Sequence, residues 1–161
     1  MLCQGEEAAL AVAVEALTED RLADLRCIGR PELALTSRRA ETLKAQVYDG
    51  DVARLAVPDD LGVSWLRAMA DPADDLRQPM KGPFLCLRDG GAALHRAAIQ
   101  IAKSAHLLPA ALLVPVPNGA EAATFSNLTL IDLREATPAL AEASAMHEIV
   151  SARLPMVASP T

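Results

Sequence analysis

The chain has 161 residues, the length of one domain, and 52% of them are hydrophobic, which is enough to bury one core. Aromatic residues make up only 2%, so stacking partners for nucleic-acid bases are scarce. The net charge is −6, and basic residues are interleaved with acidic ones. This composition argues against nucleic acid and anionic membranes as partners.

The three cysteines, Cys3, Cys27 and Cys86, form no Cys-x-x-Cys pair, so neither a disulfide framework nor a zinc site is indicated. We expect Cys27 and Cys86 to be buried thiols that pack as small hydrophobic side chains. The N-terminal segment lacks a basic region, and no apolar run reaches the roughly 20 residues of a membrane span. The sequence therefore predicts a cytoplasmic protein that does not cross a membrane.

The first third of the chain alternates strands and helices. Residues 8–17 form an apolar run that predicts a strand, and Thr18 is a good N-cap for a helix over Glu19–Ile28. A second short strand is predicted over Glu32–Thr36, followed by a helix over Ser37–Lys44.

The middle third follows the same pattern. Val52–Val57 is predicted to be a strand, and residues 58–60 to open a helix whose apolar stripe places Trp65 in the core. Residues 71–82 contain helix-breaking prolines and are expected to form a loop, and Phe84–Leu87 alternates as a strand would.

The last third contains the strongest helix, Ala92–His106, and the apolar strand Ala110–Val116, whose composition is typical of a strand covered on both faces. Leu128–Ile131 is a further strand candidate, Asp132 can cap a helical turn after it, and His147–Leu154 alternates as a strand would. Together these elements predict one compact α/β domain, with a mixed and largely buried sheet flanked by helices.

Several blocks of sequence, taken in order, resemble the 3,4-dihydroxy-2-butanone 4-phosphate synthases of riboflavin biosynthesis. They are residues 10–18 (LAVAVEALT), 33–36 (LALT), 75–79 (DLRQP), 88–91 (RDGG), 101–111 (IAKSAHLLPAA) and 130–133 (LIDL). The resemblance covers about two thirds of the chain and implies the fold of that family.

The resemblance also implies a chemistry that this chain is not equipped to perform. These synthases convert ribulose 5-phosphate into a four-carbon phosphate and formate, with Mg²⁺ held by an acidic loop and a histidine. In this sequence Gly5 falls on a metal-binding glutamate, Leu94 on the metal-binding histidine, and Arg96 on a catalytic glutamate. We therefore expect no catalytic residue, no metal and no cofactor.

The polar side chains that remain near the expected pocket are Glu7, Arg30, Lys81, His95 and Arg96. Within this remnant pocket, His95 is expected to be a solvated histidine at a helix start, and His106 to cap the last turn of the same helix. An alternative function is a small enzyme or binding domain for a phosphorylated sugar, with Arg30, Lys81 and Arg96 gripping the phosphate and Glu7 as base.

The leading hypothesis is a degenerate, non-catalytic domain that precedes a GTP cyclohydrolase II-type domain in the same polypeptide. Residues 1–137 would form the synthase-like domain, and residues 138–161 the lead-in, in which residues 151–155 (SARLP) resemble the start of such a cyclohydrolase. The parent protein would be a hydrolase. The resemblance to dimeric synthases and the surplus of apolar residues predict a homodimer, besides possible docking onto the C-terminal domain.

Overall fold

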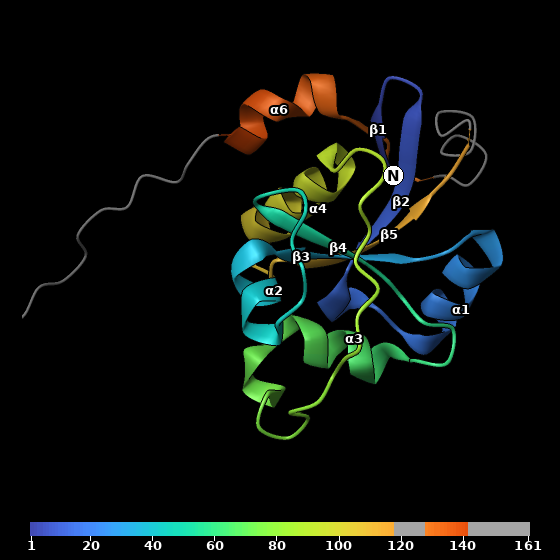
Figure 1. Ribbon diagram of the computed structural model, residues 1–161. Helices are drawn as coiled ribbons and strands as arrows, with labels where there is room; N and C mark the ends of the chain where they lie inside the picture. Colours follow the sequence, from blue (N-terminus) through green and yellow to red (C-terminus); the bar gives the residue numbers. More distant parts are fainter. Residues whose placement is uncertain (118–127, 142–161) are drawn as a thin grey trace, which may run out of the picture.

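The computed structural model describes residues 1–117 and 128–141 (Figure 1). In this part of the chain six strands form one sheet in the order β4-β3-β5-β2-β1-β6. β1 runs parallel to β6, and the other neighbouring strands are antiparallel, so the sheet is mixed, as predicted. The strands are β1 (Leu2–Gln4), β2 (Glu7–Ala13), β3 (Glu32–Thr36), β4 (Val52–Ala56), β5 (Ala110–Pro115) and β6 (Ile131–Asp132).

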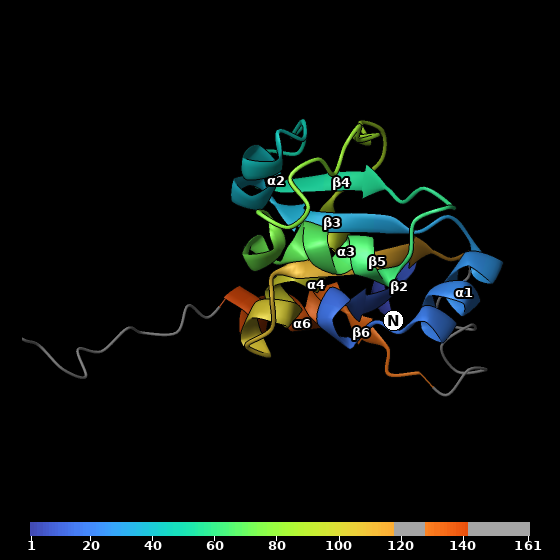
Figure 2. The ribbon, with the colours of Figure 1, turned by 90° about the horizontal axis from the view of Figure 1, so that it is seen from below.

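Helices cover both faces of this sheet, which gives three layers (Figures 1 and 2). The α-helices are α1 (Glu19–Ile28), α2 (Ser37–Leu43), α3 (Val63–Ala70), α4 (Ala93–Ser104) and α6 (Leu133–Ala141), and short 3₁₀ turns are η1 (Val14–Ala16) and η2 (Pro72–Asp74). Side chains from α1, α2 and α3 pack in the core on one face, and side chains from α4 and α6 pack in the core on the other. The predicted fold class is confirmed.

Strand β3 shows how the sheet divides the core. Leu33 and Leu35 pack on the face covered by α1 and α3, whereas Ala34 packs on the face covered by α4. This follows from the alternation of side chains along a strand. Residues Ala110 to Val114 of β5 are all buried, which confirms that this strand is covered on both sides.

Local sequence signals place most helix starts. Thr18 accepts a hydrogen bond from the backbone N–H of Arg21 through Oγ1, and Thr36 accepts one from Arg39, each at 3.3 Å. Asp132 caps α6 in a similar way, since its Oδ1 accepts from the N–H of Arg134 at 2.9 Å. These caps satisfy N–H groups that lack a partner within the helix. The predicted bounds of α1 and β3 are correct.

Several observed elements depart from the prediction. The strand candidate Leu128–Ile131 is a strand only from Ile131, and that strand, β6, ends at Asp132. The strand β1 was not expected; it pairs with β2 across a tight hairpin in which Gly5 has a φ of 64°, a conformation that favours glycine. Phe84–Leu87 is not a strand, because only Cys86 bridges to Leu55 of β4. Helix α3 begins at Val63, so residues 58–60 precede the helix instead of opening it.

Two side chains expected in the core lie elsewhere. Cys27 is exposed on α1, so its predicted burial is wrong, and Cys86 is only partly buried. Trp65 is half-buried: its ring packs against the core, and its Nε1–H donates to the carbonyl of Lys81 at 3.1 Å. The indole N–H needs a hydrogen-bond acceptor, and the ring therefore lies at the edge of the core, where the carbonyl of Lys81 is within reach.

Helix α6 runs through the expected boundary between residues 137 and 138. The predicted strand His147–Leu154 lies outside the described residues. Within the described residues no helix is both long and apolar enough to span a bilayer.

A partly buried arginine, Arg39, fixes the loop after α3. Arg39 of α2 makes two hydrogen bonds to the carboxylate of Asp75, at 2.6 and 2.7 Å, and Lys81 pairs with the same carboxylate. The Arg39 guanidinium also donates to carbonyl oxygens at the end of α3, those of Ala68, Met69 and Asp71. Arg39, followed by Lys81, holds the pKa of Asp75 well below its usual range.

This cluster predicts a pH-dependent contribution to stability. A carboxylate whose pKa is lowered in the folded state stabilises the fold at every pH above the pKa of an ordinary aspartate. This contribution is lost as the pH falls below about 4. We expect Asp75→Asn to lower the free energy of unfolding by about 2 kcal/mol at pH 7, with a difference that shrinks below pH 4. Urea denaturation across pH measures it. The exposed Asp24→Asn is the control, and a pH-independent difference would contradict the prediction.

Candidate functional site

A cavity of about 370 Å³ lies where the N-terminal end of α4 meets the β1–β2 hairpin. Its walls come from segments far apart in the sequence. The polar side chains that line it are Glu6, Glu7, Glu32, Arg54, Asp89 and His95. A volume in this range is compatible with a small organic ligand.

A largely buried polar contact in this cavity joins α4 to β3. Nε2 of His95 lies 2.8 Å from Oε2 of Glu32, and His95 is only 5% exposed. The prediction of a solvated His95 is therefore wrong. The reason lies in the tertiary structure, because Glu32, 63 residues earlier in the sequence, supplies a carboxylate as hydrogen-bond partner. This partner offsets the free-energy cost of burying the polar ring.

The pairing determines what the imidazole can do. Glu32 as a carboxylate accepts from Nε2–H, so a neutral ring carries its lone pair on Nδ1. Nδ1 is buried and has no hydrogen-bond partner among the described residues. A ring oriented in this way by a carboxylate is the arrangement found for proton-accepting and metal-binding histidines. However, no group of three His, Cys, Asp or Glu side chains in the described part is placed to hold a metal ion.

Among the described residues, one arginine lines the cavity, and it is already paired. Arg54 of β4 is 3% exposed, and its Nε lies 2.8 Å from Oδ2 of Asp49. Its Nη1 and Nη2 donate to the carbonyl oxygens of Asp89 and Gly90, at 2.9 and 3.3 Å. The guanidinium thereby fixes the loop that leads into α4, and little of its charge remains for a ligand.

Glu7 is exposed at the start of β2 and faces the same loop. Its Oε2 lies 3.5 Å from the position that a Cβ atom would take at Gly91, so the missing side chain lets the loop and the carboxylate approach closely. Glu7 and His95 therefore line one cavity.

The other three predicted residues lie elsewhere. Lys81 is buried in the cluster with Asp75 and lines a different cavity, between residues 43–46 and 79–86. Arg96 points away from the site, and its Nε lies 2.6 Å from Oδ1 of Asp51. Arg30 is exposed after α1 and lines none of these cavities. The structure thus brings together two of the five predicted residues.

Sequence reasoning missed Arg54 as a site residue and did not connect Glu32 with His95. A signal for Arg54 was present, since a charged residue interrupts the otherwise apolar strand over residues 52–57. Such a charge in a buried strand requires a partner. The identity of the partner was not readable, because Asp49 lies in an irregular segment.

Two further residues bear on chemistry. His106 is exposed, has a φ of 58° and follows α4, so the expectation that it lies in the last helical turn is wrong. Burial raises the pKa of the Cys3 thiol in β1, which lowers the thiolate fraction at neutral pH and opposes a nucleophilic role.

The buried pair predicts strong thermodynamic coupling. Glu32→Gln and His95→Gln each disturb a desolvated contact, so we expect a double-mutant cycle to give at least about 1 kcal/mol of coupling in the free energy of unfolding. The matched control is the exposed pair Arg96–Asp51, for which less than about 1 kcal/mol is expected. Equal coupling in the two cycles would contradict the assigned role of burial.

No protein-family model matches the sequence. No curated protein matches it either. Among solved structures, the fold is similar to a crystal structure of the 3,4-dihydroxy-2-butanone 4-phosphate synthase of Candida albicans, with a TM-score of 0.62. The match covers 88% of this chain and 90% of that chain, at 15% sequence identity. The chain therefore has a dihydroxybutanone phosphate synthase-like fold.

Proposed function

We propose that this chain is a non-catalytic, cytoplasmic domain of the synthase fold that serves as an assembly module. The observation that carries the proposal is the state of the cavity beside α4. Its arginine is paired with Asp49, and Gly5 and Leu94, at positions that the resemblance assigns to metal ligands, carry no ligand group.

Two of those positions serve the fold instead. Gly5 forms the tight hairpin turn between β1 and β2, where its positive φ favours glycine. Leu94 is buried in the core between α4 and the sheet. A metal ligand at either position would need a polar side chain, which the turn conformation or the apolar core disfavours.

The geometry gives less support to binding of a phosphorylated sugar at the same pocket. That function requires Arg30, Lys81 and Arg96 to converge, and these residues occupy separate parts of the molecule, two of them in ion pairs. Glu7 without a nearby unpaired cation would repel a phosphate.

We expect the purified chain to release no formate from ribulose 5-phosphate with Mg²⁺, because Gly5 and Leu94 offer no oxygen or nitrogen ligand. Formate is measured by a coupled assay, with a catalytic synthase as positive control. Turnover above a protein-free blank would contradict the non-catalytic assignment.

The larger assembly that we propose is a fusion to a GTP cyclohydrolase II-type domain. Its support is the sequence of residues 151–155 and the order of domains common in this pathway. A downstream reading frame with three closely spaced cysteines would support the fusion, and a stop codon after Thr161 would contradict it.

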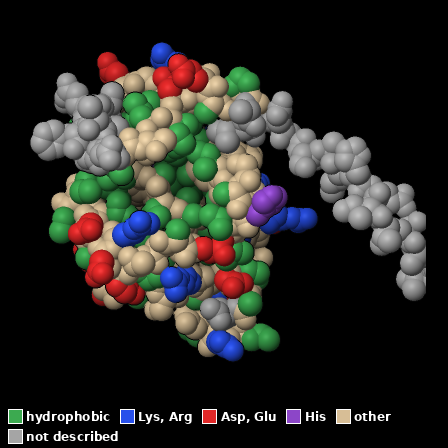
Figure 3. Space-filling model, turned by 180° about the vertical axis from the view of Figure 1, so that it is seen from behind, with side chains coloured by type: hydrophobic (Ala, Val, Ile, Leu, Met, Phe, Trp, Pro, Cys, Tyr) green, Lys and Arg blue, Asp and Glu red, His purple; other side chains and the backbone are tan. Residues whose placement is uncertain are grey.

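A homodimer is the assembly that the apolar surface favours. Leu107, Leu128 and Leu130 are large apolar side chains that are each at least one-third exposed. Leu107 lines a cavity of about 140 Å³ together with Ile101 of α4 and Ile131 of β6. Figure 3 shows hydrophobic side chains gathered in a hollow on the side that lies at the back of Figure 1. A symmetric partner would remove this apolar area from water.

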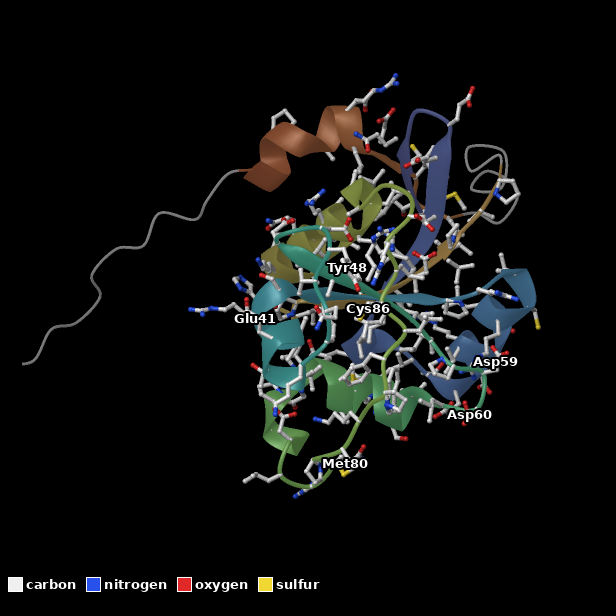
Figure 4. The ribbon with its side chains drawn as sticks, viewed as in Figure 1. Glu41, Tyr48, Asp59, Asp60, Met80 and Cys86 are labelled. Atoms are coloured by element: carbon white, nitrogen blue, oxygen red, sulfur yellow. The ribbon has the colours of Figure 1, made fainter. Side chains whose placement is uncertain are left out.

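We expect light scattering at micromolar concentration to give twice the 17.0 kDa mass of one chain. Leu130→Glu, at 40% exposure, should shift the mass to that of a monomer, because it places a charge in the proposed apolar interface. Leu76→Glu is the control, since Leu76 is 96% exposed on the loop after α3. Met80, later in this loop, lies at the end of the molecule opposite α6 (Figure 4). A monomeric wild-type chain would contradict the dimer.

A further inference from the structure

The His95 cavity, of about 370 Å³ at the start of α4, has a polar wall made mostly of carboxylates. They belong to Glu6 and Glu7 of the β1–β2 hairpin, Asp89 of the loop before α4, and Glu32 of β3. The first three are exposed, and their side chains form no ion pair or hydrogen bond with any described residue. The cavity therefore presents negative charge that no described cation neutralises.

The hydrogen-bond donors in this wall are already occupied. All three nitrogen atoms of the Arg54 side chain donate, to Asp49 and to two carbonyl oxygens of the loop before α4. Nε2 of His95 lies against Glu32. To a ligand, the described side chains of the wall thus offer mainly acceptors.

One of these acceptors is buried and lacks a partner. His95 is 5% exposed, and its Nδ1 forms no hydrogen bond with any described residue. With Nε2–H donated to Glu32, Nδ1 of a neutral ring carries a lone pair, and a buried lone pair without a donor costs free energy. Both residues line the cavity, so a ligand there can supply the missing donor. This observation is independent of the carboxylates.

The rest of the wall is apolar and, among the described residues, contains no aromatic ring. Leu94 and Leu113 are buried residues that line it. A quaternary ammonium ion has no N–H group and is typically recognised by the faces of aromatic rings. A primary ammonium ion donates three hydrogen bonds, as the lysine side chain does. The wall therefore fits a primary ammonium ion better than a quaternary one.

A second cavity, a cleft of about 710 Å³ along α4 and α2, has the opposite charge. Arg38 of α2 and Arg96 and Lys103 of α4 line it, against one carboxylate, that of Asp51. It shares no lining residue with the His95 cavity. Because a cleft attracts ligands of charge opposite to its own, a cation is drawn to the His95 cavity and away from this cleft.

We propose that the His95 cavity binds a small primary amine in its protonated form. The ammonium group donates to Nδ1 of His95 and to the carboxylates of Glu7 and Asp89, and the apolar body of the amine packs against Leu94 and Leu113. A metal ion fits less well, since no three His, Cys, Asp or Glu side chains in the described part are placed to hold one. The inference is independent of the proposed assembly role, because neither a dimer nor a fused domain requires a ligand here.

Isothermal titration calorimetry of the full chain with cyclohexylamine tests the proposal. At about pH 8 the amine is protonated, whereas an ordinary imidazole is neutral. We expect saturable binding that is weaker, by about tenfold, for the N-trimethylated analogue, which keeps the charge and the apolar body but has no N–H group. Cyclohexanol, which lacks the charge, should also bind more weakly, and Mg²⁺ should not displace the amine.

The exposed carboxylates provide variants that spare the core. Glu7→Gln/Asp89→Asn should weaken cyclohexylamine binding about tenfold, because it removes two exposed charge contacts. The matched control is Glu41→Gln/Asp59→Asn, which removes the same charge at two exposed positions outside the cavity (Figure 4). This control should leave the affinity unchanged, and circular dichroism confirms that both variants are folded.

Nuclear magnetic resonance of isotope-labelled protein addresses His95 directly. The Nδ1 resonance of His95 should shift as cyclohexylamine is added, because its lone pair accepts a hydrogen bond, whereas the ring of the exposed His106 should not respond. The proposal is overturned if cyclohexylamine shows no saturable binding at millimolar concentration, or if the trimethylated analogue or cyclohexanol binds as tightly. It is equally overturned if Mg²⁺ displaces the amine, if the Glu7/Asp89 variant binds as the wild type does, or if the Nδ1 resonance does not move at saturation.

Discussion

The buried guanidinium of Arg54 is the constraint on which the rest of the site depends. A charge at 3% exposure in the middle of a strand requires neighbours that neutralise it, and Asp49 and two loop carbonyls do so. The segment around Asp49 is anchored further by Arg96, which reaches it from α4, and by the N–H of Ser37 at the start of α2, which donates to the carbonyl of Asp51. One short irregular segment thereby links β4, α2 and α4, and both cavities lie beside it.

The same pairing of charges recurs elsewhere in the described part of the chain. Buried polar groups in this domain are mostly paired with one another: His95 with Glu32, Lys81 and Arg39 with Asp75, and Arg54 with Asp49. Such pairs stabilise a unique arrangement of helices on the sheet. The exposed cations Arg38 and Lys103 are different, because they line a cleft and are not paired within the described residues.

The fold makes weaker demands on the sequence than a catalytic site does. The fold rests on apolar alternation, as in β3 and β5, and many sequences satisfy that requirement, so it persists at 15% identity to the Candida albicans enzyme. Catalysis instead needs particular side chains at particular positions. Gly5 suits the hairpin turn and Leu94 suits the core, so both residues favour the fold. Neither side chain offers an oxygen or nitrogen atom that could bind a metal.

The sequence by itself determined the elements whose signals are local. The N-cap Thr18 and the apolar run of β3 set the bounds of α1 and β3, because capping and alternation depend on residues a few positions apart. Only the tertiary structure decided the rest. The strand β1 exists because β2 and β6 pair with it, His95 is buried because Glu32 lies opposite, and Lys81 and Arg96 are drawn into separate ion pairs by Asp75 and Asp51. These contacts join residues distant in sequence, and no local pattern encodes which partner a buried charge will find.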